Sequence, residues 1–398
     1  ERAGCGLHMD SVATVIFWAS AVLVVYVYAG YPVALWLLGA CGLGRPVRRG
    51  TIEPPVTLVI SAYNEVAVIG EKLRNSLALD YPPDRLQVLV VSDASSDGTD
   101  EAVLAAGDPR VELLRMAERG GKTAGLNAAV RRARGEIIVF SDANALYDRL
   151  AIRHLVRNFA DPEVGAVTGE SRYQIAEEDA STEAENQYWS YELWVKRQES
   201  RLGSLVGGDG AIYAVRRELY TELGASDLSD FVNPLQVVAQ GYRNVYETEA
   251  FSNEGGAEGF GAEFRRKVRI VNRAWRATLK LRGLLNPFRH GVFALQFLSH
   301  KVLRWFVPLF LLALLVANFW LARTGVLFYS LTLAAQLAFY AAAALGFLLD
   351  RLGRPVRLLN VPYYFCAVNI ASLMGIGQAL AGRTYTTWSS SRPATPAA

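Results

Sequence analysis

Four long stretches without a charged residue constrain this chain more than any other feature of its sequence. They lie between Asp10 and Arg45 and over residues 306–322, 324–349 and 358–382. A helix needs about 20 predominantly apolar residues to cross the hydrocarbon core of a bilayer. We therefore expect one N-terminal membrane helix (residues 11–41) and three C-terminal membrane segments (within residues 306–382), with a water-exposed domain between them.

The flanking segments are interpreted from their composition. Residues 1–10 show no pattern, so we expect either a disordered start or residues left by cloning. Residues 279–305 mix Leu, Phe and Trp with Lys and Arg, which is typical of amphipathic helices in the membrane interface. Basic residues such as Arg48, Arg289 and Arg354 border the membrane segments. By the positive-inside rule we expect a multi-pass protein of a bacterial-type inner (plasma) membrane with its central domain in the cytoplasm.

Composition excludes several kinds of partner and site. The net charge of +3 is too small to indicate nucleic acid as a partner. The three cysteines lie far apart and indicate neither a disulfide framework nor a thiolate metal site. Four scattered histidines leave little material for a zinc centre.

The central domain, residues 42–278, alternates between strand and helix patterns. We expect strands at residues 56–61, 87–92, 111–115 and 136–140, with helices at 65–79, from Asp97 onward, and at 124–133. This succession predicts an α/β domain with a parallel, doubly wound (Rossmann-like) sheet. Further on we expect a helix at 148–159, a strand at 165–169 and a long helix at 182–201.

Polar residues follow three of these strands, where ligands bind in open α/β sheets. The segments are Ser61–Glu65, Ser92–Thr99 and Ser141–Asn144, and Gly120–Lys122 adds a flexible basic loop suited to phosphate. Asp142 and Asn144 are two residues apart, so on an extended backbone both side chains point the same way. Their oxygens suit Mg²⁺ or Mn²⁺. Taken singly, each segment is also explained by ordinary turn and helix-cap chemistry.

Together these motifs resemble family 2 glycosyltransferases with the GT-A fold. The similarity covers about residues 54–251, and charge-free flanks resemble the membrane-embedded branch that includes hyaluronan, chitin-oligosaccharide and cellulose synthases. It is carried by Ala62-Tyr63-Asn64-Glu65, Ser92-Asp93, Ser96–Thr99, Gly121-Lys122, Leu126-Asn127, Ser141–Asn144, Gly207–Ala211, Ser229-Asp230, Pro234-Leu235 and Gly241–Arg243.

The resemblance implies roles for individual residues. Asp230 would be the catalytic base, and the alternative for Asp230 is a helix N-cap. Asp142 would bind the metal, with Asn144 in place of the family's second Asp. Nucleotide-sugar binding would involve Ala62, Tyr63, Glu65, Asp93 on the uracil side, Lys122 at the diphosphate, and Asp142. Gly208, Asp209 and Gly210 would line the acceptor end, and Asp209 is the rival candidate for the base.

A basic segment with a tryptophan bears on the acceptor. Processive relatives carry a QxxRW motif, and this chain has Arg273 and Trp275 near that place without the motif. The resemblance suggests that both contact the acceptor, although a solvated basic helix face explains them equally well.

The segment 358–382 leaves two topologies open. As a further span it would carry the tail, residues 383–398, out of the cytoplasm. Yet Thr386-Thr387-Trp388 is similar to the gating-loop element of related synthases, in which Trp388 would act at the acceptor site. Both hold only if residues 358–382 are re-entrant or interfacial, and otherwise Trp388 is an interface anchor.

We therefore predict a membrane-bound, metal-dependent, inverting glycosyltransferase. It would move a sugar from a UDP-sugar to a growing polysaccharide or oligosaccharide, with possible coupling to export. The alternative is a single addition to a membrane lipid or lipid-linked acceptor, which the missing QxxRW favours. A third interpretation is a non-catalytic, nucleotide-sensing subunit of a secretion complex, and the presence of both Asp142 and Asp230 argues against it.

Overall fold

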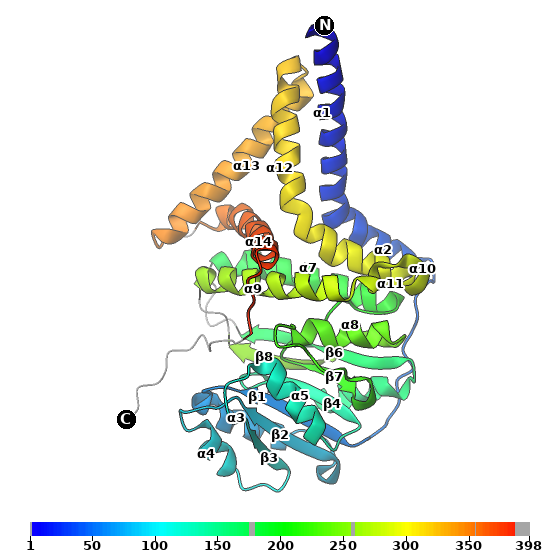
Figure 1. The fold of residues 1–398 in the computed structure, drawn as a ribbon, viewed down its shortest axis with the longest axis vertical. Helices are drawn as coiled ribbons and strands as arrows, with labels where there is room; N and C mark the ends of the chain where they lie inside the picture. Colours follow the sequence, from blue (N-terminus) through cyan, green and yellow to red (C-terminus); the bar gives the residue numbers. More distant parts are fainter. Residues whose placement is uncertain (1, 175–179, 256–258, 355, 387–398) are drawn as a thin grey trace.

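A mixed sheet forms the lower half of the molecule, shown as a ribbon in Figure 1. The computed structural model describes residues 2–174, 180–255, 259–354 and 356–386, and the sheet has eight strands within that part of the chain. In order they are β3 (Val111–Arg115), β2 (Leu86–Ser92), β1 (Val56–Ala62), β4 (Ile137–Asp142), β7 (Tyr213–Arg216), β6 (Val164–Gln174), β8 (Arg243–Gly255) and β5 (Leu146–Tyr147). The first four are mutually parallel, so the carboxyl ends of β1, β2 and β4 meet at one edge.

Helices cover both faces of the sheet, which explains why its central strands are almost wholly apolar. Every residue of β1 is buried, with Leu58 and Ile60 in one hydrophobic cluster and Val59 in the other. This alternation is the two-residue period of a strand. The first cluster includes side chains of α3 (Val66–Leu77), α4 (Thr99–Leu104) and α6 (Ala151–Val156). The second includes side chains of α5 (Lys122–Arg132), α8 (Ser229–Ala239) and α9 (Gly259–Lys280).

The alternating strands and helices predicted up to β4 are confirmed, with shifted ends. β3 spans the predicted residues, whereas α5 begins at Lys122, two residues earlier than expected. The extended backbone on which the side chains of Asp142 and Asn144 would point the same way is not observed, because β4 ends at Asp142 and the chain turns at Ala143–Asn144. Asp and Asn bond readily to nearby backbone and favour such turns. β6 and α7 (Ala180–Leu202) are both longer than predicted.

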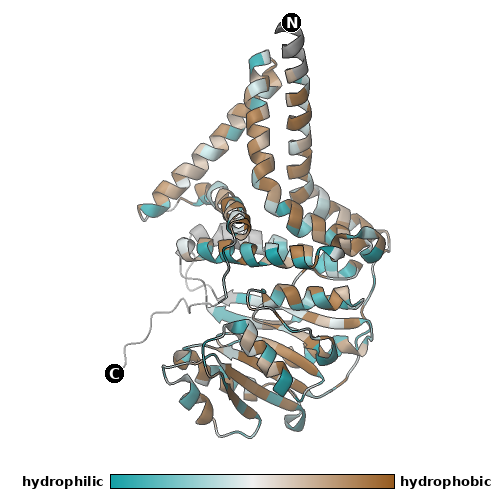
Figure 2. Cartoon of the chain, in the orientation of Figure 1, coloured by the Kyte–Doolittle hydropathy of each residue, from teal (hydrophilic) through white to brown (hydrophobic). Residues whose placement is uncertain are grey.

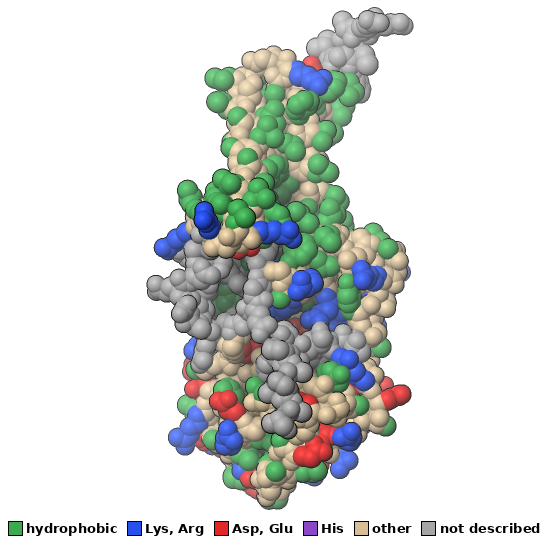
Figure 3. Space-filling model, turned by 90° about the vertical axis from the view of Figure 1, so that its left-hand side faces the viewer, with side chains coloured by type: hydrophobic (Ala, Val, Ile, Leu, Met, Phe, Trp, Pro, Cys, Tyr) green, Lys and Arg blue, Asp and Glu red, His purple; other side chains and the backbone are tan. Residues whose placement is uncertain are grey.

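In the described residues, four helical stretches are long and apolar enough to cross a membrane: Met9–Ala40, Val292–Thr324, Leu327–Arg351 and Arg357–Leu380. They are the largely brown helices above the sheet in Figure 2. Lys and Arg side chains gather in Figure 3 between these helices and the sheet domain. α1 (Arg2–Val25) begins at Arg2, so residues 2–10, where we expected a disordered or cloning-derived start, are helical. Ala, Leu and Arg are good helix formers, and they extend the helix of the membrane segment.

Two of these stretches bend at π-helical turns. α1 continues through the π turn Tyr26–Gly30 into α2 (Tyr31–Ala40). The short α10 (Pro287–His290) precedes α11 (Val292–Phe297), which continues through the π turn Leu298–Leu303 into α12 (Arg304–Leu321). A π turn inserts a residue into a helix and is a common cause of a kink. In Figure 1, α1 and α12 stand together, while α2 and α11 turn aside toward the sheet domain. Thus only the later part of the segment expected in the interface (279–305), from Val292 onward, runs without a break into α12.

α14 (Arg357–Leu380) packs along α9 and differs from the other candidate spans, including the slanting α13 (Leu327–Arg351). Half of its most apolar 18-residue window is buried, compared with 11–28% in the others. Gly375 allows the close approach, because an added Cβ would lie 2.8 Å from the Val268 carbonyl oxygen. The residues on the other side of α14 are exposed and apolar: Ile370, Leu373, Met374 and Leu380.

One face of α14 is thus buried against α9 and the opposite face is exposed and apolar, and an interfacial or re-entrant position for α14 stays a prediction. After α14 the chain runs back toward the sheet domain. The carbonyl of Arg383, just after α14, accepts a hydrogen bond from Asn272 Nδ2 of α9 (3.1 Å). The predicted acceptor contact Trp388 lies outside the described residues.

Candidate functional site

Two loops at the carboxyl ends of β1 and β2 hold each other in place. Asn64 donates its backbone N–H to Ser95 Oγ (3.1 Å), and its side-chain oxygen accepts from the Ser96 N–H (3.0 Å). Asn64 and Ala94 have φ angles of +54° and +57°, which residues other than glycine rarely adopt. Such strained conformations cluster at functional sites. Here they occur in the two loops expected to bind the nucleotide.

Three residues at the end of β1 were expected to bind the nucleotide sugar, and their side chains differ in burial and partners: Ala62, Tyr63 and Glu65. The Arg119 guanidinium lies 3.8 Å from the centroid of the Tyr63 ring, which sequence reasoning did not anticipate. Glu65 donates its backbone N–H to Thr99 Oγ1 (2.9 Å) and has a half-buried side chain. The methyl group of Ala62 is buried in the core, so only its backbone borders the loops.

Asp93 shapes the loop before α5. Its side-chain oxygens accept the backbone N–H groups of Gly120 (2.8 Å) and Gly121 (3.0 Å), and the residue is only 2% exposed. Gly121 has a φ of +83°, which a side chain would disfavour. Asp93 therefore holds the basic loop over the sheet edge, and its expected contact with uracil stays a prediction.

Lys122 and Asp142 meet at the centre of this edge. Lys122 is the first residue of α5, and its Nζ donates to Asp142 Oδ1. Burial disfavours the charged form of Lys122, but the adjacent Asp142 outweighs burial and raises the pKa of Lys122. The Lys122 cation thus persists at neutral pH. Asn144, half-buried in the turn after β4, is close to Asp142 in the chain.

Asp230 lies across from this pair in the first turn of α8. The N-cap of α8 is Leu228, so the alternative role of Asp230 as N-cap is wrong. A Cβ built on Gly210 would lie 3.4 Å from Asp230 Oδ2, which places the carboxylate against the glycine loop. Burial raises the pKa of Asp230, and Lys122 opposes this effect while Asp209 adds to it. A raised pKa makes a carboxylate a better proton acceptor for a hydroxyl group.

Asp209 is not an equivalent candidate for the base, because its oxygens are engaged. Oδ1 accepts from Ser171 Oγ (2.5 Å) and the Ala211 N–H (3.2 Å), and Oδ2 accepts from the Ser171 N–H (3.2 Å). Gly208 next to it touches α8: an added Cβ would lie 2.7 Å from the carbonyl oxygen of Asp230. Gly208, Asp209 and Gly210 therefore form a fixed wall beside Asp230.

α9 holds the loop that leads to Asp230. Arg273 donates from Nε to the Ser226 carbonyl (3.1 Å) and from Nη2 to the Asp227 carbonyl, and Lys280 Nζ lies 2.8 Å from Asp227 Oδ2. Arg273 thus positions this loop, and its expected contact with an acceptor stays a prediction. Trp275 packs edge-on against Phe306, with ring centroids 5.6 Å apart, and so connects α9 to the base of α12.

Two charged residues near Asp142 were missed by sequence reasoning. Lys72 Nζ is fully buried and donates to the Ala145 carbonyl, and burial lowers the pKa of Lys72 to about 7. Burial, with Asp209 and Asp142 nearby, raises the pKa of Glu254 to about 7. The only sequence signal for Lys72 is its place among buried positions of α3, and Glu254 gives none, because a long-range strand pairing brings it to the site.

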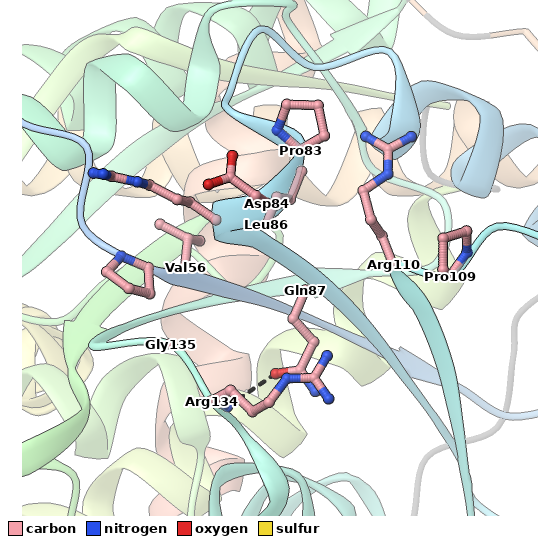
Figure 4. Close-up of a pocket in the computed structure, with 11 residues that line it drawn as sticks. Val56, Pro83, Asp84, Leu86, Gln87, Pro109, Arg110, Arg134 and Gly135 are labelled. Atoms are coloured by element: carbon pink, nitrogen blue, oxygen red, sulfur yellow. Dashed lines mark hydrogen bonds between the residues drawn. The ribbon is translucent and has the colours of Figure 1, made fainter.

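A cavity of about 210 Å³ lies at the edge of the sheet opposite to Asp142 and Asp230 (Figure 4). Its lining includes Val56, Leu86 and Gly135, at the amino ends of β1, β2 and β4. Two of its arginines are already paired: Arg110 with Asp108 (2.8 Å) and Arg134 with Glu112 (2.6 Å). This cavity is separate from Asp142 and Asp230, and the candidate site is the carboxyl edge.

Comparisons with known proteins agree with this geometry. Residues 57–224 match the family model described as Glycosyl transferase family 2. A segment of 175 residues is 32% identical to Beta-monoglucosyldiacylglycerol synthase of Trichormus variabilis, covering 43% of this chain and 37% of that protein. Over 259 residues the chain is 25% identical to Poly-beta-1,6-N-acetyl-D-glucosamine synthase of Staphylococcus aureus, covering 60% of this chain and 62% of that protein. The chain therefore spans less than two thirds of either relative.

The structural likeness extends over most of the chain. The mannosyltransferase PcManGT from Pyrobaculum calidifontis, solved in complex with GDP-Man and Mn²⁺, superposes with a TM-score of 0.69 at 24% identity. The match covers 94% of this chain and 99% of that one. It confirms the predicted fold class, a GT-A domain with α-helical membrane segments.

Proposed function

Because residues 57–224 form a family 2 glycosyltransferase domain, we propose that this membrane protein is an inverting glycosyltransferase that moves a sugar from a UDP-sugar to a growing glycan. The observation that carries the proposal is the convergence of three groups at one sheet edge. Asp230 lies against the Gly210 loop and interacts electrostatically with Lys122, which is paired with Asp142. A base thus faces a cation and a carboxylate suited to a diphosphate and its metal.

The donor is bound by the parallel half of the sheet. Tyr63, stacked on Arg119, offers an aromatic face and a positive charge beside the strained loops. Lys122 approaches the diphosphate at the N-terminus of α5, where backbone N–H groups also favour anions. The names of the relatives support a nucleotide-sugar donor, since PcManGT was solved with GDP-Man. UDP is our assignment from the resemblance of the loop motifs.

The side-chain oxygens of Asp142 and Asn144 suit Mg²⁺ or Mn²⁺ that is also bound by the substrate. Magnesium sites commonly use one or two carboxylates plus phosphate oxygens and water. The Asp142 side chain is 37% exposed, so it has access to such a shared ion. Asp142 and Asn144 would hold the ion, and its charge would stabilise the diphosphate leaving group. Mn²⁺ in the PcManGT complex supports this assignment.

Asp230 supplies the base for transfer. Its carboxylate takes the proton of the acceptor hydroxyl while that oxygen bonds to the anomeric carbon of the sugar. The bond from that carbon to the diphosphate oxygen breaks, and UDP leaves with the electron pair. Attack from the side opposite the leaving group inverts the anomeric configuration. Lys122 pairs with the diphosphate and stabilises the charge that develops on it.

A membrane lipid or lipid-linked acceptor is the second candidate. A cavity of about 430 Å³, lined mainly by apolar and aromatic side chains, lies among α1, α12, α13 and α14 and includes Trp18, Phe328 and Phe365. All four elements are candidate spans, so a hydrocarbon chain suits this cavity. Relatives named for a polysaccharide product and for a glycolipid product both match this chain.

The proposed location is a bacterial-type inner membrane, with the sheet domain in the cytoplasm. Arg45, Arg48 and Arg49 follow α2, and Lys280 and Arg282 end the α9 region, all on the side of the sheet domain. The positive-inside rule assigns that side to the cytoplasm. The presence of Asp142 and Asp230 argues against a non-catalytic, nucleotide-sensing subunit.

The experiment is incubation of the purified protein with radiolabelled UDP-sugars and Mg²⁺ or Mn²⁺. Wild type should release UDP and yield either a polymer or a labelled lipid, which product size distinguishes. Asp142→Asn should lose metal-dependent turnover and bind UDP more weakly. Asp230→Asn should bind UDP normally and lose transfer. Full transfer by Asp230→Asn would refute the base assignment, and equal turnover by both variants and wild type would refute an enzyme acting at this site.

A further inference from the structure

A buried carboxylate, Glu199 of α7, joins both bent membrane helices to the glycine loop of the site. It is fully buried, with 0% of its surface exposed. Its Oε1 accepts from the hydroxyl of Tyr31 (2.5 Å) and lies 2.7 Å from His300 Nδ1. Its Oε2 accepts the backbone N–H of Val206 (3.2 Å). One side chain therefore contacts three segments that are far apart in the sequence.

The first two partners lie at the bends of the membrane helices. Tyr31 directly follows the π turn Tyr26–Gly30, and His300 is within the π turn Leu298–Leu303. The two turns contact each other, with Tyr26 Oη 2.8 Å from Ser299 Oγ. π turns inside helices are frequent at functional sites. The extra residue in each turn changes the helix direction and presents Tyr31 and His300 to the same carboxylate.

Neighbouring groups fix this junction further. His300 Nε2 lies 3.2 Å from Glu192 Oε2, and Arg304 Nη1 donates to Glu192 Oε1. Gln296 Nε2 donates to the backbone carbonyl of Glu199 (3.2 Å). Two buried carboxylates of α7, Glu192 and Glu199, thus contact side chains of the bent helix α11–α12. Removing one partner from a buried hydrogen-bonded network destabilises the protein, because the remaining polar groups stay buried without a partner.

The third partner, Val206, begins the loop that bounds the catalytic base. Gly207 follows it, and its carbonyl accepts from Asn244 Nδ2 (2.7 Å), which holds the other side of the loop. Gly208 and Gly210 then lie against the backbone and carboxylate of Asp230. The chain of contacts runs from membrane helix to Glu199, to Val206, to the glycine loop and to Asp230.

We infer that Glu199 is a positioning residue for sugar transfer, which couples the bends of α1–α2 and α11–α12 to the loop Val206–Gly210. This inference rests on the proposed function of Asp230 as the base. Glu199 does not touch the substrate. Its hydrogen bond to Val206 fixes the distance between the loop and α8. That distance sets the space in which the acceptor hydroxyl meets Asp230.

Glu199→Gln tests the coupling with little change in shape. The amide has one oxygen and one NH₂ group, whereas Glu199 accepts hydrogen bonds at both oxygens. Whichever way the amide turns, its NH₂ group meets either the Val206 N–H or the Tyr31–His300 pair. Tyr31→Phe is a milder variant that removes one hydroxyl. Glu247→Gln is the matched control, because Glu247 is 1% exposed and binds Arg157 and Asn158, away from the loop.

Three readouts are compared in lipid nanodiscs: affinity for UDP with Mn²⁺, kcat for transfer from the UDP-sugar that wild type uses, and hydrogen exchange of the peptide 204–212. Glu199→Gln should lower kcat on the order of 10²-fold, as an ångström-scale misplacement does. Tyr31→Phe should lower kcat by about 10-fold, the loss of one hydrogen bond to a charged group. Both should speed exchange at Val206 and leave UDP affinity and the donor KM unchanged.

Several results would overturn the inference. They are a wild-type kcat in Glu199→Gln, a loss of UDP affinity that parallels the loss of kcat, or an equal effect of Glu247→Gln. Unchanged exchange at residues 204–212 in Glu199→Gln would also overturn it, without reference to any activity. If wild type transfers no sugar while exchange responds as expected, the proposed function fails and the mechanical coupling of Glu199 to the loop stands.

Discussion

Gly208→Ala should separate transfer from donor binding, because Gly208 touches the backbone of the catalytic helix. The added Cβ would lie 2.7 Å from the Asp230 carbonyl oxygen and 3.2 Å from Pro234 Cγ, whereas ordinary contacts begin at 3.4 Å. The loop or α8 must therefore yield by about 0.7 Å, the difference between 3.4 and 2.7 Å. Overpacking of this kind typically costs about 1–3 kcal/mol of stability.

A shift of that size at the base should lower kcat for transfer by about 10- to 100-fold. UDP affinity should stay at the wild-type value, because the nucleotide loops follow β1 and β2 on the other side of the site. The assay compares kcat, measured as UDP release, with UDP affinity measured by titration calorimetry. Gly203→Ala is the control, since nothing lies within 4 Å of its added Cβ. Wild-type kcat in Gly208→Ala, or an equal loss in Gly203→Ala, would refute the reasoning.

Three further predictions follow from contacts of the site and of α14. Transfer should fall as the pH drops through the pKa of Asp230, because the protonated carboxyl cannot accept a proton. Burial raises this pKa, so the fall in rate should occur at a higher pH than for an ordinary Asp. A pH–rate profile on the acidic side checks this. Lys122→Met should move that limb to still higher pH, because the Lys122 charge lowers the pKa of Asp230, and it should weaken UDP binding in a titration. Gly375→Ala should destabilise the protein by about 1–3 kcal/mol in thermal unfolding, because its Cβ would meet the backbone of α9. Gly377→Ala, with open space at its Cβ, should not destabilise it; similar unfolding of the two variants would contradict the proposed packing.

Local signals account for the parts of the fold that sequence predicted. The apolar strands β1, β2 and β4 end in polar turns, and these ends share an edge whenever the strands are parallel. Asp142, Lys122 and Asp230 were proposed from the order of motifs along the chain, and the structure brings these three residues together. The expectation of an extended backbone through Asn144 was wrong, because the chain turns at Ala143–Asn144. Local chemistry offered this alternative, since Asp and Asn favour turns.

Long-range pairing explains what sequence could not predict. Leu146 pairs with Asn253 and Tyr147 with Ser252, so continuing the register places Glu254 opposite Ala145, next to the turn proposed to bind the metal. More than 100 residues separate these segments, and the sequence of β8 carries no sign of its partner. α14 is a similar case: its hydropathy resembles that of a membrane span, but its contact with α9 depends on the surface that α9 presents.

The proposed site combines residues inside the family match with residues beyond it. The family model covers residues 57–224, which include β1 to β7 and the donor loops, and it ends before Asp230. α8, α9 and α14 lie beyond it, together with the loop contacts of Arg273 and Lys280. These helices connect Asp230 to the side of the candidate membrane spans, from which the proposed glycan or lipid acceptor would arrive. The match thus includes Glu199 and the loop with Gly208, whereas Asp230 and the helices that hold it lie beyond it. Substitutions at Gly208 and Glu199 should alter transfer while donor binding persists, because they act on the side of the site next to Asp230 and not on the loops after β1 and β2.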